Sequence, residues 1–202
     1  MIADPMEELT KQVMSRLFVE LEASARHVHL TKEQALRLFG HALTPQRPLS
    51  QPGQFLARER VTVAGPKGEL CHVAVLGPER SEAQVEISMT DARVLGLQPP
   101  IRESGQVAES PGAVLRSETA QITIDSGVIV AQRHLHLTPE DAARFCVADR
   151  QVVRLQVFTQ RPLIFQDVLV RVRPDFATRA HLDFDEANAC GLQPGDVGRI
   201  LS

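Results

Sequence analysis

The sequence contains neither tryptophan nor tyrosine, and its three cysteines are widely separated. Aromatic cages and base-stacking platforms would therefore have to be built from phenylalanine alone. Cys71, Cys146 and Cys190 form no Cys-x-x-Cys zinc motif, and three scattered thiols do not make a disulfide framework. We expect reduced, partly buried thiols, since no local feature marks one of them as an activated nucleophile.

Long apolar runs and clustered basic charge are missing as well. No run approaches the roughly 20 apolar residues that a membrane span needs, and no charged region followed by an apolar one opens the chain. The formal net charge is −3, with both signs interspersed, so there is no basic footprint for nucleic acid or anionic lipid. The glycine-rich phosphate-binding patterns of P-loop and Rossmann proteins are absent too. We expect a cytoplasmic protein that binds neither nucleic acid nor membrane.

The first segment, MEELTKQVMSRLFVELEA (residues 6–23), has an amphipathic pattern. Met6, Leu9, Val13 and Leu17 recur at helical spacing with charged residues between them. This pattern predicts a helix whose apolar face needs a partner surface. That surface is either the body of the protein, an oligomer interface, or the receptor of a targeting segment.

Most of the remaining chain predicts short strands. Alternating, β-branched runs are separated by glycine and proline turns, and long helical patterns are few. Closely spaced strands of this kind favour barrels or sandwiches over a doubly wound sheet. The main predicted strand regions are residues 61–65, 70–77, 84–88, 120–137, 151–158 and 163–172.

One stretch of sequence occurs twice. ARHVHLTKEQALRLFG at residues 25–40 aligns with QRHLHLTPEDAARFCV at residues 132–147, with about half of the positions identical. In each copy a threonine, Thr31 or Thr138, is a good N-cap for a short helix. Each copy therefore predicts a strand, a cap and a short helix, and the duplication suggests two related small domains.

Each copy carries two histidines separated by one apolar residue. Side chains at positions i and i+2 of a strand share a face, about 6 to 7 Å apart, so His27 and His29 emerge together, as do His134 and His136. Paired imidazoles can converge on a zinc ion or on an anion. The alternative is that these histidines are structural residues in a polar rim. Two such pairs in a duplicated stretch of sequence favour the metal or anion site over this alternative.

An open catalytic zinc site usually has three protein ligands, so further candidates are needed. Glu86 shares a strand face with Gln84 and Ser88, and His181 precedes a predicted helix. Arg80, in the turn before the strand that carries Glu86, can offer a bidentate fork to phosphate or carboxylate. Taken singly, each of these residues is also compatible with an ordinary solvated position.

Several motifs together resemble the phosphotransacylase family of propanediol utilisation (PduL type), also called phosphate propanoyltransferases. They are SARHVHL, PLSQPGQF, GPKG, LGPERSEAQVEIS, TDARVLGLQPPIRESG, SPG, GVIVAQRHLHLTPEDAARF and HLDFDEANACGL. The similarity runs from about Leu21 to the C-terminus. The sequence departs from the family pattern at Cys146, where glycine is expected, and at VAES (residues 107–110), which replaces a glycine-bearing stretch.

The resemblance implies transfer of a short acyl group, propanoyl or acetyl, between coenzyme A and inorganic phosphate at a two-zinc site. It implies that Arg80 binds phosphate, that the protein forms a homodimer, and that an N-terminal helix can direct the enzyme to the shell proteins of a bacterial microcompartment. The implied zinc ligands are His27, His29, Glu86, His134, His136 and His181.

The resemblance also implies a mainly β fold of two small barrels capped by short helices. We expect an N-terminal helix in residues 1–18, one barrel in residues 26–131, and a second barrel formed by residues 19–25 together with 132–202. Two other functions stay open: a zinc-dependent hydrolase that acts on esters or thioesters, and a non-catalytic zinc-binding module.

Overall fold

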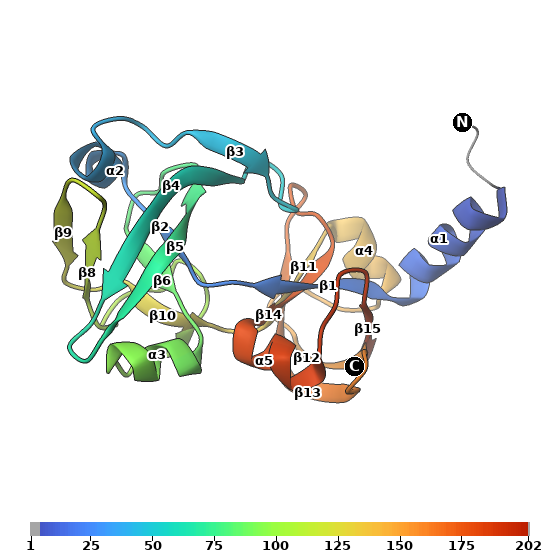
Figure 1. The fold of residues 1–202 in the computed structure, drawn as a ribbon. Helices are drawn as coiled ribbons and strands as arrows, with labels where there is room; N and C mark the ends of the chain where they lie inside the picture. Colours follow the sequence, from blue (N-terminus) through green and yellow to red (C-terminus); the bar gives the residue numbers. More distant parts are fainter. Residues whose placement is uncertain (1–4, 202) are drawn as a thin grey trace. The chain divides into compact units, whose positions relative to one another are not determined.

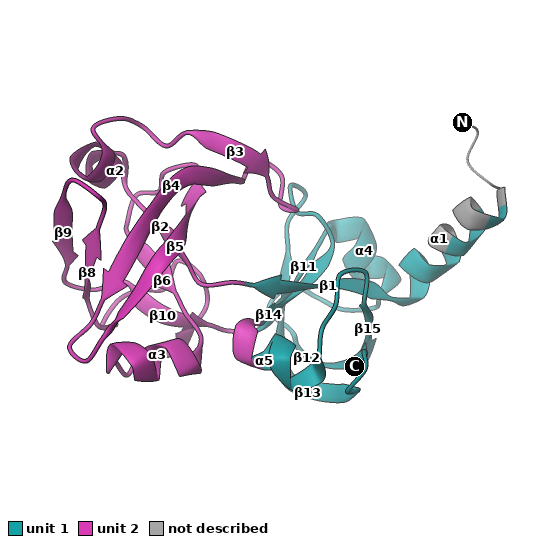
Figure 2. Cartoon of the chain, in the orientation of Figure 1, with its two compact units in different colours: residues 1–24, 133–182, 186–202 teal, residues 25–132, 183–185 magenta. Residues whose placement is uncertain are grey.

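A computed structural model describes residues 5–201 of the chain. Contacts between residues divide it into two compact units (Figure 2). Unit 1 comprises the described residues of 1–24, 133–182 and 186–202, and unit 2 comprises residues 25–132 and 183–185. Each repeat therefore falls almost entirely within a unit of its own.

The fold class predicted from the sequence, mainly β with short helices, is confirmed (Figure 1). The helices are α1 (Pro5–Leu17), α2 (Lys32–Phe39), α3 (Met89–Leu95), α4 (Pro139–Arg144) and α5 (Phe184–Cys190).

Unit 1 contains a closed barrel of six strands in the order β1-β14-β11-β13-β12-β15. Its strands are β1 (Val19–Ser24), β11 (His134–Leu137), β12 (Val152–Phe158), β13 (Leu163–Val172), β14 (Arg179–Asp183) and β15 (Val197–Leu201). Alternate side chains fill the interior, where Leu135, Leu155 and Leu182 are almost fully buried.

Unit 2 contains a nine-stranded sheet that curls into a half-barrel, so only one of the two expected barrels closes on itself. The strand order is β7-β10-β6-β2-β5-β4-β8-β9, with β3 paired to β4. The strands are β2 (His27–His29), β3 (Pro45–Pro48), β4 (Phe55–Ala64), β5 (Glu69–Gly77), β6 (Gln84–Glu86), β7 (Ile101–Arg102), β8 (Ala113–Arg116), β9 (Gln121–Ile124) and β10 (Val128–Ala131). Its own core includes Val28, Val75, Val85, Leu95 and Leu115.

The N-terminal helix is followed directly by the first strand of the barrel in unit 1. Helix α1 ends at Leu17, and the chain continues as strand β1, which pairs with β15. The cause is a change of period, because Val19 and Leu21 alternate with glutamates and are buried in the barrel core. The apolar side chains of α1, including Leu9 and Val13, are exposed. None of the helices within residues 5–201 has the length and apolar character that a membrane span requires.

Candidate metal centres

Strand pairing brings a third candidate ligand to each histidine pair. In unit 2, β2 runs antiparallel to β6, and His27 lies directly opposite Glu86. In unit 1, β11 runs antiparallel to β14, and His134 lies directly opposite His181. Residues directly opposite one another in a sheet share a face. The two units therefore use the same arrangement: a His-x-His strand with a third donor across from its first histidine.

Helix caps end the strands that carry these residues. Thr31 begins α2 two residues after His29, and its hydroxyl accepts a hydrogen bond from the backbone of Gln34 in a reciprocal capping box. Thr138 begins α4 after the second pair, and its hydroxyl accepts a hydrogen bond from the backbone of Asp141. Ser88 begins α3 two residues after Glu86, again with a capping box. A cap stops the strand and fixes the direction of the following chain.

The first cluster consists of His27, His29 and Glu86, all of which are buried. Their candidate ligand atoms lie within 4.8 Å of one another. The Nδ1 of His27 lies 2.7 Å from the carbonyl oxygen of Ala25. A carbonyl can only accept, so Nδ1 carries the proton and Nε2, 3.5 Å from Glu86 Oε1, is left for a ligand bond.

The two histidines of this cluster have pKa values shifted in opposite directions. Burial lowers the pKa of His27, but the charge and hydrogen bond of Glu86, with the Ala25 carbonyl, outweigh it and leave this pKa raised. Burial, followed by the charges of His27 and Arg80, holds the pKa of His29 well below the ordinary value. His29 is therefore neutral at pH 7, as a metal ligand must be.

The second cluster consists of His134, His136 and His181, whose candidate ligand atoms also lie within 4.8 Å of one another. The His134 and His181 rings stack with centroids 5.1 Å apart, and His136 is 4.6 and 4.8 Å from them. The ring of Phe176 packs against His136 at 4.1 Å. The cluster thus presents three imidazoles on one face of the unit 1 barrel.

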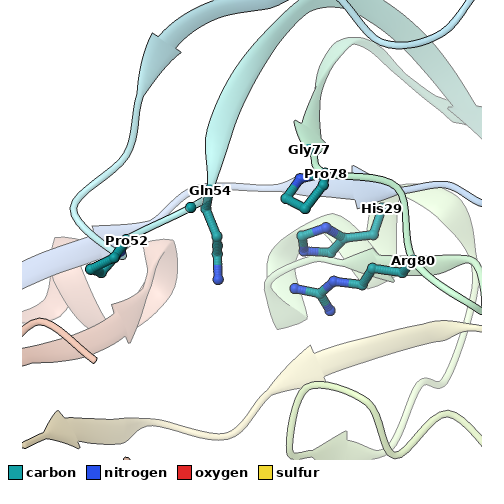
Figure 3. Close-up of a pocket in the computed structure, with 7 residues that line it drawn as sticks. His29, Pro52, Gln54, Gly77, Pro78 and Arg80 are labelled. Atoms are coloured by element: carbon teal, nitrogen blue, oxygen red, sulfur yellow. The ribbon is translucent and has the colours of Figure 1, made fainter. Parts of the chain in front are cut away.

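Arg80 lies beside the first cluster. Its backbone N–H donates to the carbonyl of Leu30 at 2.8 Å, and its Nη1 donates to Ser104 Oγ at 3.0 Å. His29 and Arg80 extend toward the same space as the amide of Gln54 (Figure 3). This space is a cavity of about 270 Å³, lined by His29, Pro52, Gly53, Gln54, Gly77, Pro78 and Arg80. A guanidinium next to a candidate metal ligand suits an anionic substrate group.

The donor sets fit zinc. Two imidazoles with a carboxylate, and three imidazoles, are both donor sets of zinc sites with an open position. The Nδ1 of His29 is buried and has no hydrogen-bond partner among the described residues. A buried polar atom without a partner is costly, and another group is expected to satisfy it. Each cluster lies within one unit, so each can hold a metal ion by itself.

Two polar residues near the first cluster were not singled out from the sequence. Gln84, 2% exposed, and Ser104 form hydrogen bonds that connect Glu86 to Arg80. The position of Gln84 on the face of Glu86 was visible in the sequence. Ser104 gave no local signal, because it lies in a loop 20 residues from Gln84.

Fold and site together define a class of protein: two duplicated β units, each carrying a three-donor cluster suited to zinc, with an arginine-lined cavity beside one of them. Comparison with known proteins gives the family. The family model for phosphate propanoyltransferase matches residues 20–193, so the chain belongs to the phosphate propanoyltransferase family.

Full-length relatives agree with this assignment. The phosphate propanoyltransferase of Enterococcus faecalis is 52% identical over 98% of this chain and 98% of its own length. That of Leptotrichia buccalis is 54% identical over 89% and 86%, and that of Thermotoga maritima is 46% identical over 100% and 99%.

Proposed function

We propose that this protein transfers a propanoyl group between coenzyme A and inorganic phosphate, using two zinc ions, one in each histidine cluster. Membership in the phosphate propanoyltransferase family supports the reaction. The observation that carries the metal proposal is the repeated arrangement of three buried or half-buried donors on paired strands, once in each unit. If the histidines had only a structural role, neither their repetition in the second unit nor a third donor beside each pair would be needed.

In the forward reaction, a phosphate oxygen attacks the thioester carbonyl carbon, and the carbon–sulfur bond breaks to release coenzyme A as a thiolate. Arg80 holds the phosphate through its guanidinium, which donates to Ser104, while the backbone N–H of Arg80 donates to the carbonyl of Leu30 and fixes the main chain at this residue. His29 lies beside Arg80 in the same cavity and is neutral, so it adds no charge that would compete for the phosphate.

Zinc, when bound, supplies Lewis-acid chemistry: it stabilises a thiolate leaving group and offsets negative charge on an oxyanion. The protein holds the donors ready for it. The Ala25 carbonyl fixes the tautomer of His27, and burial keeps His29 unprotonated. Direct attack by phosphate needs no covalent acyl-enzyme, so no serine or cysteine nucleophile is required.

We extend the proposal to acetyl coenzyme A as a second substrate. One methylene changes binding in an apolar pocket by only about 1 to 3 kcal/mol, so both acyl groups are expected to react at measurable rates. Parallel assays with acetyl and propanoyl coenzyme A give the preference directly.

The deciding experiment measures release of coenzyme A from propanoyl coenzyme A, with and without phosphate, on protein of known zinc content. Release that depends on phosphate, with about two zinc ions per chain, supports the proposal. Release without phosphate identifies a hydrolase instead. Bound zinc without any release of coenzyme A identifies a non-catalytic zinc-binding protein.

The exposed apolar face of α1 supports a further part of the proposal, that this helix directs the enzyme to microcompartment shell proteins. Met6, Leu9, Val13 and Leu17 are each about half exposed or more. A variant without residues 1–18 is expected to lose co-purification with shell proteins while keeping its activity. Unchanged co-purification would remove the targeting role and leave the enzyme in the general cytoplasm.

Two other expectations have their own measurements. A homodimer is expected in light scattering of the full-length chain. The domain limits at residues 26–131, and at 19–25 with 132–202, are expected to show as protected fragments in limited proteolysis.

A further inference from the structure

Gln84 occupies a central place among the polar groups of unit 2. It lies on β6, two residues before Glu86, and its side chain is almost completely buried. In the sheet it lies directly opposite His29, just as Glu86 lies opposite His27. Its amide group therefore shares one face with all three residues of the first cluster.

The amide makes three hydrogen bonds with defined directions. Its Nε2 donates to Glu86 Oε1 at 2.5 Å and to Ser104 Oγ at 2.8 Å, and its Oε1 accepts from the backbone N–H of Gly105 at 2.6 Å. A carboxylate only accepts and a backbone N–H only donates, so the amide has one orientation that satisfies all three bonds. Gln84 is thus held rigidly between β6 and the loop that begins after β7.

Ser104 extends this set of bonds to the anion-binding side. Its Oγ accepts from both Gln84 Nε2 and Arg80 Nη1. A continuous path therefore runs from the carboxylate of Glu86, through Gln84 and Ser104, to the guanidinium of Arg80, the residue next to His29 in the cavity of Figure 3. Each of the three bonds along the path joins a donor to an acceptor.

From this geometry we propose that Gln84 is a positioning residue: it fixes the carboxylate of Glu86 for metal binding and, through Ser104, the guanidinium of Arg80 for phosphate. The proposal rests on the function proposed above. Hydrogen bonds to a metal-ligating carboxylate hold it in one rotation, and their loss typically lowers metal affinity or activity by about 10- to 100-fold. Gln84 is not one of the three candidate ligands of the first cluster, and in this proposal it acts through Glu86 and Ser104.

Unit 1 places a different residue at the corresponding position. Arg179 lies opposite His136, where Gln84 lies opposite His29, and it pairs with Glu20 at 3.1 Å. The third donor of that unit is a histidine rather than a carboxylate, so a donor amide has no carboxylate to orient there. If Gln84 orients Glu86, a glutamine is needed only in the unit whose third donor is a carboxylate, and the two repeats differ in this way.

The test uses Gln84→Met, which keeps an unbranched side chain of similar length but cannot form these hydrogen bonds. Zinc affinity is measured by chelator competition in a His136→Ala background, so that only the first cluster binds. Kinetics are measured in the full chain without that background substitution. We expect zinc affinity of the first cluster to fall by about 10- to 100-fold and the KM for phosphate to rise.

Ser104→Ala separates the two arms of the proposal. It breaks the link to Arg80 but leaves the bond between Gln84 and Glu86, so the KM for phosphate should rise by about 3- to 10-fold while zinc affinity stays unchanged. Gln106→Met is the matched control, because Gln106 is an exposed glutamine in the same loop and its amide donates to Glu103, outside the path from Glu86 to Arg80. It should change neither quantity.

Unchanged zinc affinity and phosphate KM in folded Gln84→Met would overturn the proposal, even if the melting temperature falls, since a purely structural role changes stability alone. If Gln84→Met does not fold, Gln84→Asn replaces it; its amide is too short to reach Glu86 and Ser104 together, so the same two losses are expected. An unmodified protein without transferase activity would refute the proposed function, whereas the zinc titration would still decide the role of Gln84 toward Glu86.

Discussion

Removal of zinc should lower the melting temperature of this protein, because each of the two clusters can bind zinc only in the folded state. A ligand that binds only the folded state stabilises it by about 2.7 kcal/mol when its free concentration is 100 times its Kd. Each cluster gathers donors from strands far apart in sequence, His27 with Glu86 and His134 with His181, so the unfolded chain offers no comparable site. For a chain of this length, about 2 to 4 °C of melting temperature corresponds to 1 kcal/mol. Each zinc ion should therefore raise the melting temperature by about 5 to 11 °C.

The assay compares chelator-treated protein with protein refilled with zinc, by calorimetry and by metal analysis of the same samples. His29→Ala should remove the increment of unit 2, and His136→Ala the increment of unit 1. Each variant should keep about one zinc ion per chain. Identical melting of stripped and refilled protein would refute the metal assignment. Loss of both ions in a single variant would refute the inference that each cluster binds its metal within one unit.

Three other substitutions give direct measurements. Arg80→Ala should raise the KM for phosphate or lower kcat while zinc content stays at the unmodified level, and lost zinc would show that the arginine is structural. Cys146→Gly should raise stability by about 0.5 to 1 kcal/mol, because Cys146 has a left-handed φ of 54°. The control, Cys71→Gly within strand β5, should lower stability in the same melting assay. A loss of stability in both variants would contradict backbone strain at Cys146. Glu86→Gln should reduce the stability of metal-free protein below about pH 6.5. Glu86 holds the pKa of His27 raised, and the stability that protonated His27 contributes is lost as pH rises through this raised pKa. A constant difference in melting temperature between the two proteins from pH 5.5 to 8 would contradict this linkage.

The structure gives a physical reason for the glycine that the family pattern has at the position of Cys146. Comparison with the family motif led us to expect glycine there, and the structure gives the residue a backbone conformation that glycine adopts without strain. In the first repeat, helix α2 ends with Gly40 at φ 77°. Helix α4 ends at Arg144, which is two residues earlier in the alignment than the end of α2 at Phe39, so the two copies differ in helix length although their histidines and N-caps correspond.

The N-terminal segment contains a boundary that its local pattern alone does not locate; the expected limit at residue 18 came from the family resemblance. Apolar residues at helical spacing continue past Leu17, but the chain changes to a strand at Val19 because the barrel needs a sixth strand between β14 and β15. Burial of Val19 and Leu21 outweighs helical propensity at this point. No window of the sequence contains the partner strands that decide the outcome.

Local sequence alone determined which side chains emerge together from one strand. A spacing of two residues puts His27 with His29 and Gln84 with Glu86, whatever surrounds them, because successive strand residues point to opposite faces. Threonine or serine caps then end these strands, and alternating apolar residues predict the mainly β fold. These properties depend only on neighbours within a few positions.

Tertiary structure alone decided which of these strands meet, and in which register. His27 faces Glu86, and His134 faces His181, because antiparallel pairing of the strands is set by the packing of each whole unit. A shift of one residue would turn the third donor to the other face. The path from Glu86 through Gln84 and Ser104 to Arg80 depends on a loop that folds back over β6. Long-range packing fixes such contacts, and no local pattern in the chain encodes them.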